Sequence, residues 1–293
     1  MIAVISTIGD IERYLEMRLD RDTAPRAMDD NLRAEIMRVI PGKISQMCEA
    51  ATSANQRLVG YLLIGYRFLL VSLNIDAVLE EVTIRQRKKK LDEMIQGNGL
   101  RDASSATLAR IKAQKGGMSR LAMKALMWLS HSKRSLDANE LCHTLGVEIG
   151  STDLDPQNIP AIETLLGCSL GLVAPEASSH TVRLVHYTLQ EYLSDNTLLF
   201  HNPHPTIAQV CLIYLNFQCI RDLLPTHNWT GQATPLLEYA SYYWEVHSRG
   251  EITESVNKLA LTLLDRFDKH VSSGILLSRS GDNWDYGLGR VNP

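Results

Sequence analysis

Several features of enzymes and nucleic-acid-binding proteins are missing from this sequence. Its 293 residues include only five cysteines, no two of them in a C-x-x-C pair: Cys48, Cys142, Cys168, Cys211 and Cys219. The last four lie in apolar segments, so we expect them to be small buried residues of a protein from a reducing compartment. The net charge of -3 argues against nucleic acid as a partner for the whole chain, because nucleic-acid-binding domains usually carry a basic excess.

The sequence also lacks a long apolar run. The longest such segment, Leu58–Leu73, is interrupted by Gly60, Gly65 and Arg67, whereas a membrane-spanning helix needs about 18 predominantly apolar residues. The N-terminal segment Ile2–Ile8 is short and has no basic residue before it, unlike a secretory signal. We therefore expect a soluble, cytoplasmic protein that does not contact a membrane.

Motifs for catalysis and metal binding are missing as well. A P-loop has the pattern G-x-x-x-x-G-K-[ST], and the nearest segment, Gly60–Arg67, has Tyr66 in the place of the lysine. No Walker B run, H-E-x-x-H helix or G-x-S-x-G elbow occurs. We therefore expect no enzymatic activity, no catalytic residue, no metal ligand and no cofactor of the chain's own.

Helical periodicity dominates what is present. Apolar residues recur at intervals of three and four in several segments, which predicts helices that each bury one face. These segments are Asp10–Leu19, Leu32–Ile44, Phe68–Leu79, Ser119–Ser130, Ile207–Phe217, Pro235–His247 and Thr253–His270. Pro41-Gly42 should interrupt the second segment, and the polar stretch Gly97–Ser105 is taken as the first domain boundary.

The clearest local signals follow residue 130. Asp137 and Glu140 form a D-x-x-E capping box, flanked by Leu136 and Leu141 as a hydrophobic staple. Gly146 is placed to end this helix at the position after its C-cap. After the predicted loop 151–158, a short helix is expected from Pro160 to Leu166.

A β-hairpin and another helix complete this region. The apolar runs Leu170–Ala174 and Thr181–Val185 flank Pro175–His180, which predicts two short strands and a turn. Thr188 and Glu191 form a second capping box for a helix over 189–199. The order of three helices, a hairpin and a fourth helix is typical of a winged-helix domain with the hairpin as its wing.

Two features of the sequence could contact an anion. The run Arg85–Lys90 (RQRKKK) fits a nuclear localisation signal or a phosphate-binding stripe, but the acidic residues around it favour a solvated helix face. His186 lies between the second predicted strand and the following helix, where an imidazole could donate to an anion. From position alone, a packed histidine that satisfies the helix terminus is the favoured interpretation.

A longer match shifts the balance for His186. The segment Leu184–Leu193 (LVHYTLQEYL) resembles the pattern hydrophobic-hydrophobic-His-x-[ST]-x-Q-E-[FY]-L of the winged-helix domain in NACHT proteins. NACHT proteins are members of the STAND class of signalling NTPases. The same region is similar to the winged-helix domain named for GPI inositol-deacylase proteins. Further segments that look like fungal NACHT ankyrin-repeat proteins are Leu121–Lys133, Arg134–Val147, Phe200–Phe217 and Tyr239–Leu264.

The resemblance covers most of residues 10–47 and 68–285 and implies a mainly α fold. Its expected parts are a helical lid region after a missing NACHT core (1–100), a winged helix with one small β-hairpin (106–200), a helical unit (201–277) and a linker toward absent ankyrin repeats (278–293). It also implies that His186 reaches the phosphate of a bound nucleotide and holds the ADP-bound, closed state. Because no P-loop is present, another polypeptide would have to supply that nucleotide.

One segment departs from the family pattern. In NACHT proteins, a stretch like Ile44–Met47 runs almost directly into one like Phe68–Val71, so residues 48–67 are interpreted as a late insertion or a translated intron. A mature transcript that retains this segment would contradict the intron hypothesis. The abrupt ends of the resemblance suggest that the sequence is a truncated form of a longer signalling protein.

Three functions remain open at this point. The favoured one is a non-catalytic regulatory module that couples nucleotide state to repeat sensors, in fungal non-self recognition or programmed cell death, with protein partners such as an intact NACHT relative. The alternative is a DNA-binding winged-helix protein, although Pro160–Leu166 carries Glu163 and no basic residue, and the wing offers only Arg183 and His180. A scaffold without switching is the third, supported by the Tyr-rich segment Pro235–His247.

Overall fold

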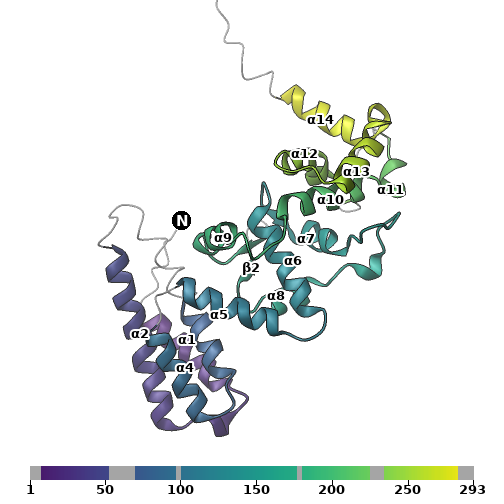
Figure 1. Ribbon diagram of the computed structural model, residues 1–293. Helices are drawn as coiled ribbons and strands as arrows, with labels where there is room; N and C mark the ends of the chain where they lie inside the picture. The colour runs from purple at the N-terminus through teal and green to yellow at the C-terminus, as the bar shows by residue number, and fades with distance from the viewer. Residues whose placement is uncertain (1–7, 53–69, 97–99, 177–179, 225–233, 283–293) are drawn as a thin grey trace, which may run out of the picture. The chain divides into compact units, whose positions relative to one another are not determined.

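The residues that the structure describes are mainly helical, with one small antiparallel sheet of three strands (Figure 1). The computed structural model describes residues 8–52, 70–96, 100–176, 180–224 and 234–282. It divides into two compact units. The first comprises Met1–Arg120, Gly167–Ala174 and Leu184–Tyr192, and the second comprises Leu121–Leu166, Pro175–Arg183 and Leu193–Pro293. The predicted fold class is therefore confirmed.

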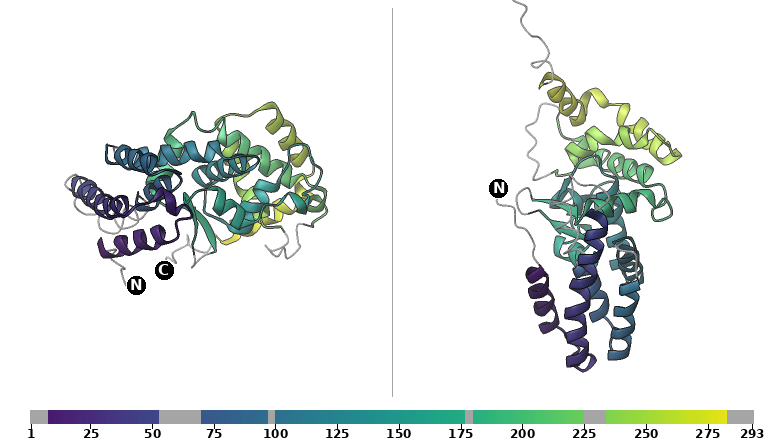
Figure 2. Two further views of the ribbon diagram at one scale, coloured as in Figure 1. Left: turned by 90° about the horizontal axis from the view of Figure 1, so that it is seen from below. Right: turned by 90° about the vertical axis from the view of Figure 1, so that its left-hand side faces the viewer.

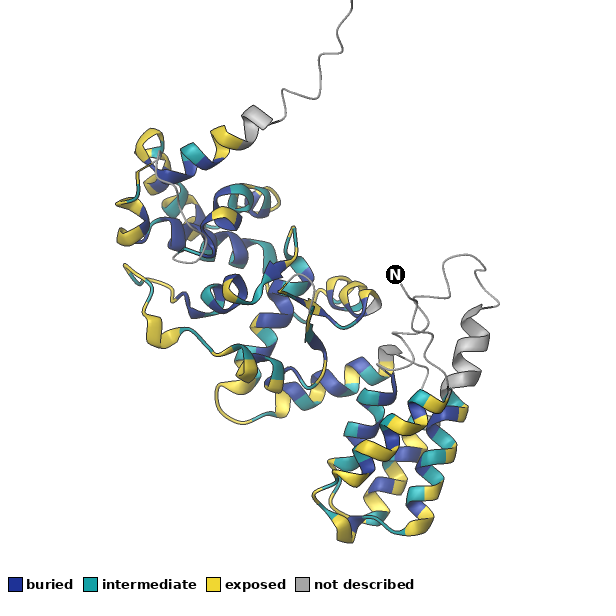
Figure 3. Ribbon diagram, turned by 180° about the vertical axis from the view of Figure 1, so that it is seen from behind, coloured by how far each residue is buried: buried dark blue, intermediate teal, exposed yellow. Residues whose placement is uncertain are grey.

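A bundle of helices makes up most of the first unit, and its long helices run side by side (Figure 2). These elements are α1 (Ile8–Asp20), the 3-10 turn η1 (Pro25–Ala27), α2 (Asp30–Thr52), a helix over residues 70–79, α4 (Ile84–Gln96) and α5 (Leu100–Ala113). The helix α2 packs against α1 and α4. Buried residues alternate with exposed ones along each helix (Figure 3). The buried residues recur every fourth position, as at Ile11, Leu15 and Leu19, which is the amphipathic pattern that predicted these helices.

Pro41 does not interrupt α2, contrary to the prediction. The helix continues from Asp30 to Thr52 with this proline in its interior. Proline removes one backbone donor and crowds the preceding turn, which costs about 3 kcal/mol in an isolated helix. In this bundle Ile36, Ile40 and Pro41 are all buried, and tertiary packing of a buried helical face outweighs local propensity.

The segment around residue 100 also differs from its prediction. Residues 100–105, expected to belong to a polar break, form the first turns of α5. The basic run Arg85–Lys90 lies in the first half of α4. The predicted insertion, residues 48–67, lies partly in the last turn of α2 and otherwise outside the described residues.

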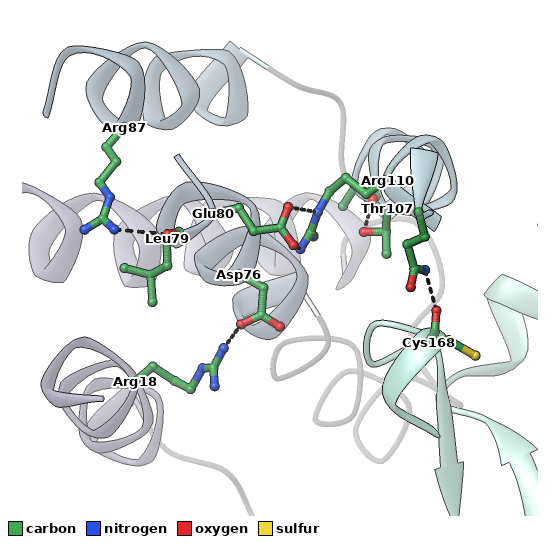
Figure 4. A network of polar contacts seen from close by, with 10 residues as sticks. Arg18, Asp76, Leu79, Glu80, Arg87, Thr107, Arg110 and Cys168 are labelled. Carbon is green, nitrogen blue, oxygen red and sulfur yellow. Dashed lines mark hydrogen bonds and ion pairs between the residues drawn. The ribbon is translucent and has the colours of Figure 1, made fainter. Parts of the chain in front are cut away.

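Ion pairs join the helices of the bundle, and Figure 4 shows two of them. Arg18 of α1 pairs with Asp76, and Arg110 of α5 pairs with Glu80. These contacts bring together residues that are 58 and 30 positions apart in the sequence. A third pair, between Arg87 and Asp22, is buried more deeply.

The second unit consists mostly of helices, some before the strands in the sequence and some after them. They are α6 (Met118–His131), α7 (Ala138–Gly146), η2 (Pro156–Asn158), α8 (Ile162–Cys168), α10 (Pro203–Leu215), α11 (Gln218–Arg221), α12 (Leu237–Ser248), α13 (Glu254–Leu264), η3 (Phe267–Lys269) and α14 (Val271–Asp282). The apolar helix α10 packs against both α12 and α13. Trp128 of α6 is buried, and its ring lies edge-on to that of Tyr239 at 5.9 Å between centroids.

The sheet contains β1 (Leu136–Asp137), β2 (Val173–Pro175) and β3 (Thr181–Leu184) in the order β1-β3-β2. The predicted hairpin is confirmed as β2 and β3. The two-residue strand β1 was not predicted, because two residues are too few to show an alternating pattern. It pairs antiparallel with β3, with Leu136 opposite Val182 and Asp137 opposite Thr181.

The capping box that begins α7 is confirmed in both directions. The Asp137 carboxylate accepts from the backbone N–H of Glu140 at 2.8 Å, and the Glu140 carboxylate accepts from the backbone N–H of Asp137 at 2.9 Å. The role assigned to Gly146 is wrong, because it is the last residue of the helix and has no left-handed backbone. A Cβ atom at Gly146 would instead lie 3.2 Å from Cγ1 of Ile159 and 3.3 Å from the carbonyl oxygen of Asn158. Close approach therefore requires this glycine.

The C-terminal elements agree with prediction in position but not in length. Thr253 caps α13 by accepting from the backbone N–H of Val256, yet this helix ends at Leu264 and not at His270. Residues 278–282, predicted as linker, belong to α14. Cys142, Cys168 and Cys211 are buried as expected, whereas Cys219 is exposed.

Candidate functional site

The junction between β3 and α9 (Tyr187–Asp195) carries the one candidate site residue that the sequence singles out. β3 ends at Leu184 and α9 begins at Tyr187, so His186 is the residue directly before the helix. Its backbone carbonyl accepts from the N–H of Leu189, three residues later, at 3.1 Å, a 3-10-type bond that is common in the first turn of a helix. The helix begins two residues earlier than predicted. Thr188 therefore lies in the first turn of α9 and not at its N-cap.

His186 is held on both sides of its backbone. The preceding Val185 donates its N–H to the carbonyl of Leu172 at 3.1 Å. The imidazole of His186 is buried, with 8% of the residue exposed, and lies 4.6 Å from the Tyr187 ring between centroids. Its burial is consistent with a packed histidine that has only a structural role. Its position at a helix N-terminus is consistent with contact to an anion. The role of His186 in phosphate sensing therefore stays a prediction.

The surface that a winged helix uses for DNA is acidic in this chain. Between Val147 and Cys168, which spans α8 and the loop before it, the sequence has four carboxylates and no lysine or arginine: Glu148, Asp153, Asp155 and Glu163. All four are exposed. Neutralising DNA phosphates requires Lys or Arg at such positions, so this helix is poorly suited to a DNA groove.

The wing adds little positive charge. Arg183 of β3 lies 3.3 Å from the carboxylate of Glu176, so its charge is already paired within the hairpin. His180, the other candidate for a phosphate contact, is exposed. The wing and α8 together therefore lack the basic surface that nucleic-acid binding needs.

The basic run in α4 separates into two kinds of residue. Arg85, Lys88 and Lys89 are exposed, and Lys89 lies 3.8 Å from Glu93, as expected of a solvated helix face. Arg87 is fully buried and makes an ion pair with Asp22. The interpretation of the whole run as a solvated face was therefore wrong at Arg87. A helical wheel places this residue on the same face as Leu91, which is also buried.

Three histidines that belong to no sequence motif lie close together in the second unit. His204 Nδ1 is 2.8 Å from His247 Nδ1, and the rings of His131 and His204 are 5.4 Å apart between centroids. Their positions in the sequence follow no ligand spacing, so no sequence signal could have grouped them. Among the described residues, no group of three or more His, Cys, Asp or Glu side chains is placed to hold a metal ion.

No helix in the described part of the chain combines the length and apolar character needed to cross a membrane.

A comparison with protein families matches residues 108–200 to the winged helix domain of GPI inositol-deacylase. This part of the chain is therefore a winged-helix domain of that type, as its sequence predicted. Comparisons with curated proteins and with solved structures give no match.

Proposed function

We propose that this chain is a non-catalytic regulatory module of a STAND-type signalling protein, which couples the nucleotide state of a NACHT core to repeat sensors. The observation that carries the proposal is the placement of His186 directly before α9 in a winged helix of the matched type. The motif LVHYTLQEYL, which resembles that of NACHT proteins, covers the same junction. No P-loop occurs in these 293 residues, so the nucleotide would be bound by a core outside them.

The charge distribution supports a protein partner over DNA. The exposed carboxylates of residues 147–168 would repel a phosphate backbone. Arg183 is paired with Glu176 and would not neutralise a phosphate. In the proposed closed state, the winged helix packs on the NACHT core and His186 contacts the terminal phosphate of ADP. Opening would remove this contact and free the core for nucleotide exchange.

The test is the rate of ADP release from an intact NACHT relative, with and without this chain. Fluorescent ADP is loaded on the relative, and its dissociation is followed after addition of excess unlabelled ADP. We expect the chain to slow release, because a new contact to the phosphate must break first. We expect His186→Asn to abolish the slowing, since one charge-assisted hydrogen bond contributes about 1.5–3 kcal/mol, or roughly tenfold or more in rate.

His180→Asn is the matched control, because it changes an exposed histidine on the wing of the same domain. It should slow ADP release as the wild-type chain does, and circular dichroism should show that both variants keep their helical content. Tight ADP binding by the chain alone would refute the proposal. Equal slowing by wild type and His186→Asn would refute the role of the histidine.

The alternative function, a DNA-binding winged helix, is distinguished from the proposed one by measuring how the affinity for DNA depends on salt concentration. A DNA-binding domain loses affinity steeply as salt rises, because each phosphate contact releases counterions. We expect no binding of duplex DNA even at low salt. Micromolar binding that weakens with salt, and that Arg183→Ala reduces, would favour the alternative.

A further inference from the structure

The three histidines of the second unit connect the ends of three helices. His131 is the last residue of α6, His204 is the second residue of α10, and His247 lies in the last turn of α12. Their rings form a row, with 5.4 Å between the centroids of the first two and 5.0 Å between those of the last two. The row therefore joins α6 of the winged helix to α10 and α12.

A chain of hydrogen bonds runs through this row. The two Nδ1 atoms of His204 and His247 are 2.8 Å apart, and Nε2 of His247 is 2.9 Å from the hydroxyl of Tyr239. That hydroxyl also accepts from the backbone N–H of Lys133 at 3.1 Å. Two ring nitrogens in contact can share one hydrogen but not two. Protonation of both rings would therefore set one N–H against another.

His131 is held by the end of its own helix. Its Nδ1 lies 3.1 Å from the carbonyl oxygen of Met127, which can only accept, so Nδ1 carries a hydrogen. The hydroxyl of Ser130 is 2.8 Å from the same nitrogen. The ring meets Phe200 edge-on at 5.7 Å between centroids, so one of its neighbours is apolar. A neutral imidazole satisfies these contacts.

The charged groups around the row do not compensate a cation. Lys133, just beyond the end of α6, acts on all three rings and disfavours their protonation. Arg134 lies over the Tyr239 ring at 5.3 Å. The carboxylates near the row already interact with other side chains. Glu140 binds Arg134 at 2.5 Å, Glu238 acts on the same guanidinium, Glu245 of α12 binds Arg249, and Glu251 accepts from Asn202. Among the described contacts, no carboxylate reaches any of the three rings.

Burial and these neighbours oppose protonation. Burial lowers the pKa of His247 to about 3, with further lowering by His204, Lys133 and His131. Burial also lowers the pKa of His131 and of His204. The C-terminal dipoles of α6 and α12 favour a cation, but each raises a histidine pKa by at most about 1.5 pH units, which is less than the lowering at His247. Neutral rings are therefore the form that the folded unit stabilises.

We propose that His131, His204 and His247 form an acid-responsive latch, which holds α10 and α12 against the end of α6 while the rings are neutral and loosens when they take up protons. The proposal does not depend on the nucleotide-sensing function, because it rests on contacts within the second unit alone. The sign follows from linkage. The folded latch binds protons more weakly than free imidazole, so its stability is complete above about pH 6.5 and falls as the pH drops below that value.

The experiment is hydrogen exchange of the backbone amides of α10 at pH 7.5 and pH 5.0, with intrinsic rates corrected for pH. Residues 207–215 are compared, because this part of α10 is packed against α12. Folding lowers the pKa of His247 from 6.5 to about 3. At pH 5.0 this histidine is therefore protonated mainly in the open form, which raises the equilibrium constant for opening about 30-fold relative to pH 7.5. We expect an acceleration of that order in the wild type. It should be much smaller in the double variant His204→Phe/His247→Phe, which keeps only His131 of the three rings.

The control is His201→Gln, which removes an exposed histidine three residues before His204. It should show the same acceleration as the wild type. Equal acceleration in the wild type and in the double variant would overturn the proposal, as would no acceleration in the wild type. If the double variant does not fold, nitrogen NMR of labelled histidine in the wild type decides. Rings 131, 204 and 247 that titrate independently near pH 6.5 overturn the latch, and rings that stay neutral until a lower pH support it.

Discussion

The buried ion pair between Arg87 and Asp22 offers the sharpest test of how the helices of the first unit are held together. The guanidinium of Arg87 in α4 binds the carboxylate of Asp22 with two hydrogen bonds, of 2.5 and 3.0 Å. It also donates to the backbone carbonyl of Glu81 at 2.8 Å. A further bond to the carbonyl of Leu79, of 3.0 Å, is drawn in Figure 4. The side chains of Arg87 and Asp22 are 0% and 7% exposed, so water cannot replace these bonds.

The perturbation is Arg87→Leu. It leaves a buried carboxylate without a counter-ion and two carbonyls without donors, and loss of one partner of a buried pair costs about 3–5 kcal/mol. The total stability of a domain is only about 5–15 kcal/mol, so the bundle should lose a large part of its stability. The matched control Arg85→Ala changes an exposed residue of the same helix and should alter stability by less than about 0.5 kcal/mol.

The assay is hydrogen exchange in α4, since all four tryptophans lie beyond residue 120 and fluorescence would not report on this bundle. A loss of 3 kcal/mol accelerates exchange through opening by roughly a hundredfold or more. The double variant Asp22→Leu/Arg87→Leu should recover part of the loss, because the unpaired carboxylate is gone. An Arg87→Leu protein that exchanges like Arg85→Ala would refute the reasoning.

The same pair predicts an acid dependence. The hydrogen bond from Arg87 lowers the pKa of Asp22 below its ordinary value of 3.8. The carboxylate therefore stabilises the bundle fully above about pH 4 and loses this effect as the pH falls through the lower pKa of the folded state. Exchange in α4 should accelerate below pH 4 in the wild type, and Arg87→Leu should lack this step.

Three further changes test the second unit by urea unfolding. Asp137→Ala removes the acceptor for the first turn of α7 and should cost about 1 kcal/mol; an unchanged midpoint would show that the capping box contributes nothing. Gly146→Ala should cost about 1 kcal/mol or more, because its Cβ would meet Ile159 and backbone that cannot rotate away; a stabilised protein would contradict the close approach. Trp128→Ala should cost about 3–5 kcal/mol, since this side chain is almost completely buried, and a loss under 1 kcal/mol would be inconsistent with that burial.

Local patterns were sufficient wherever a few neighbouring residues determine structure. The amphipathic spacing of Ile11, Leu15 and Leu19 predicted α1, and the D-x-x-E pattern predicted the start of α7. The hairpin was also predicted, because apolar runs and turn residues are both local signals. The winged helix followed from the order of these elements, and its family match agrees with that order.

Prediction failed wherever packing at a distance overrode a local preference. Pro41 remains inside α2 because the face around it is buried, and Gly146 is needed for contact with a residue thirteen positions later. β1 exists because β3 pairs with it. Two residues are too few to form a strand pattern, so β1 can be recognised only from its pairing with β3.

The sequence by itself determined the mainly α class, the winged-helix order and the position of His186 before α9, because each depends on periodicity or on adjacent residues. Only the tertiary structure decided that Arg87 is buried on Asp22, 65 positions away, although its neighbours in a basic run are solvated. It alone brought together His131, His204 and His247 from three helices. Charge and proton affinity depend on burial and on partners distant in sequence, and neither is encoded in the spacing of the residues that carry them.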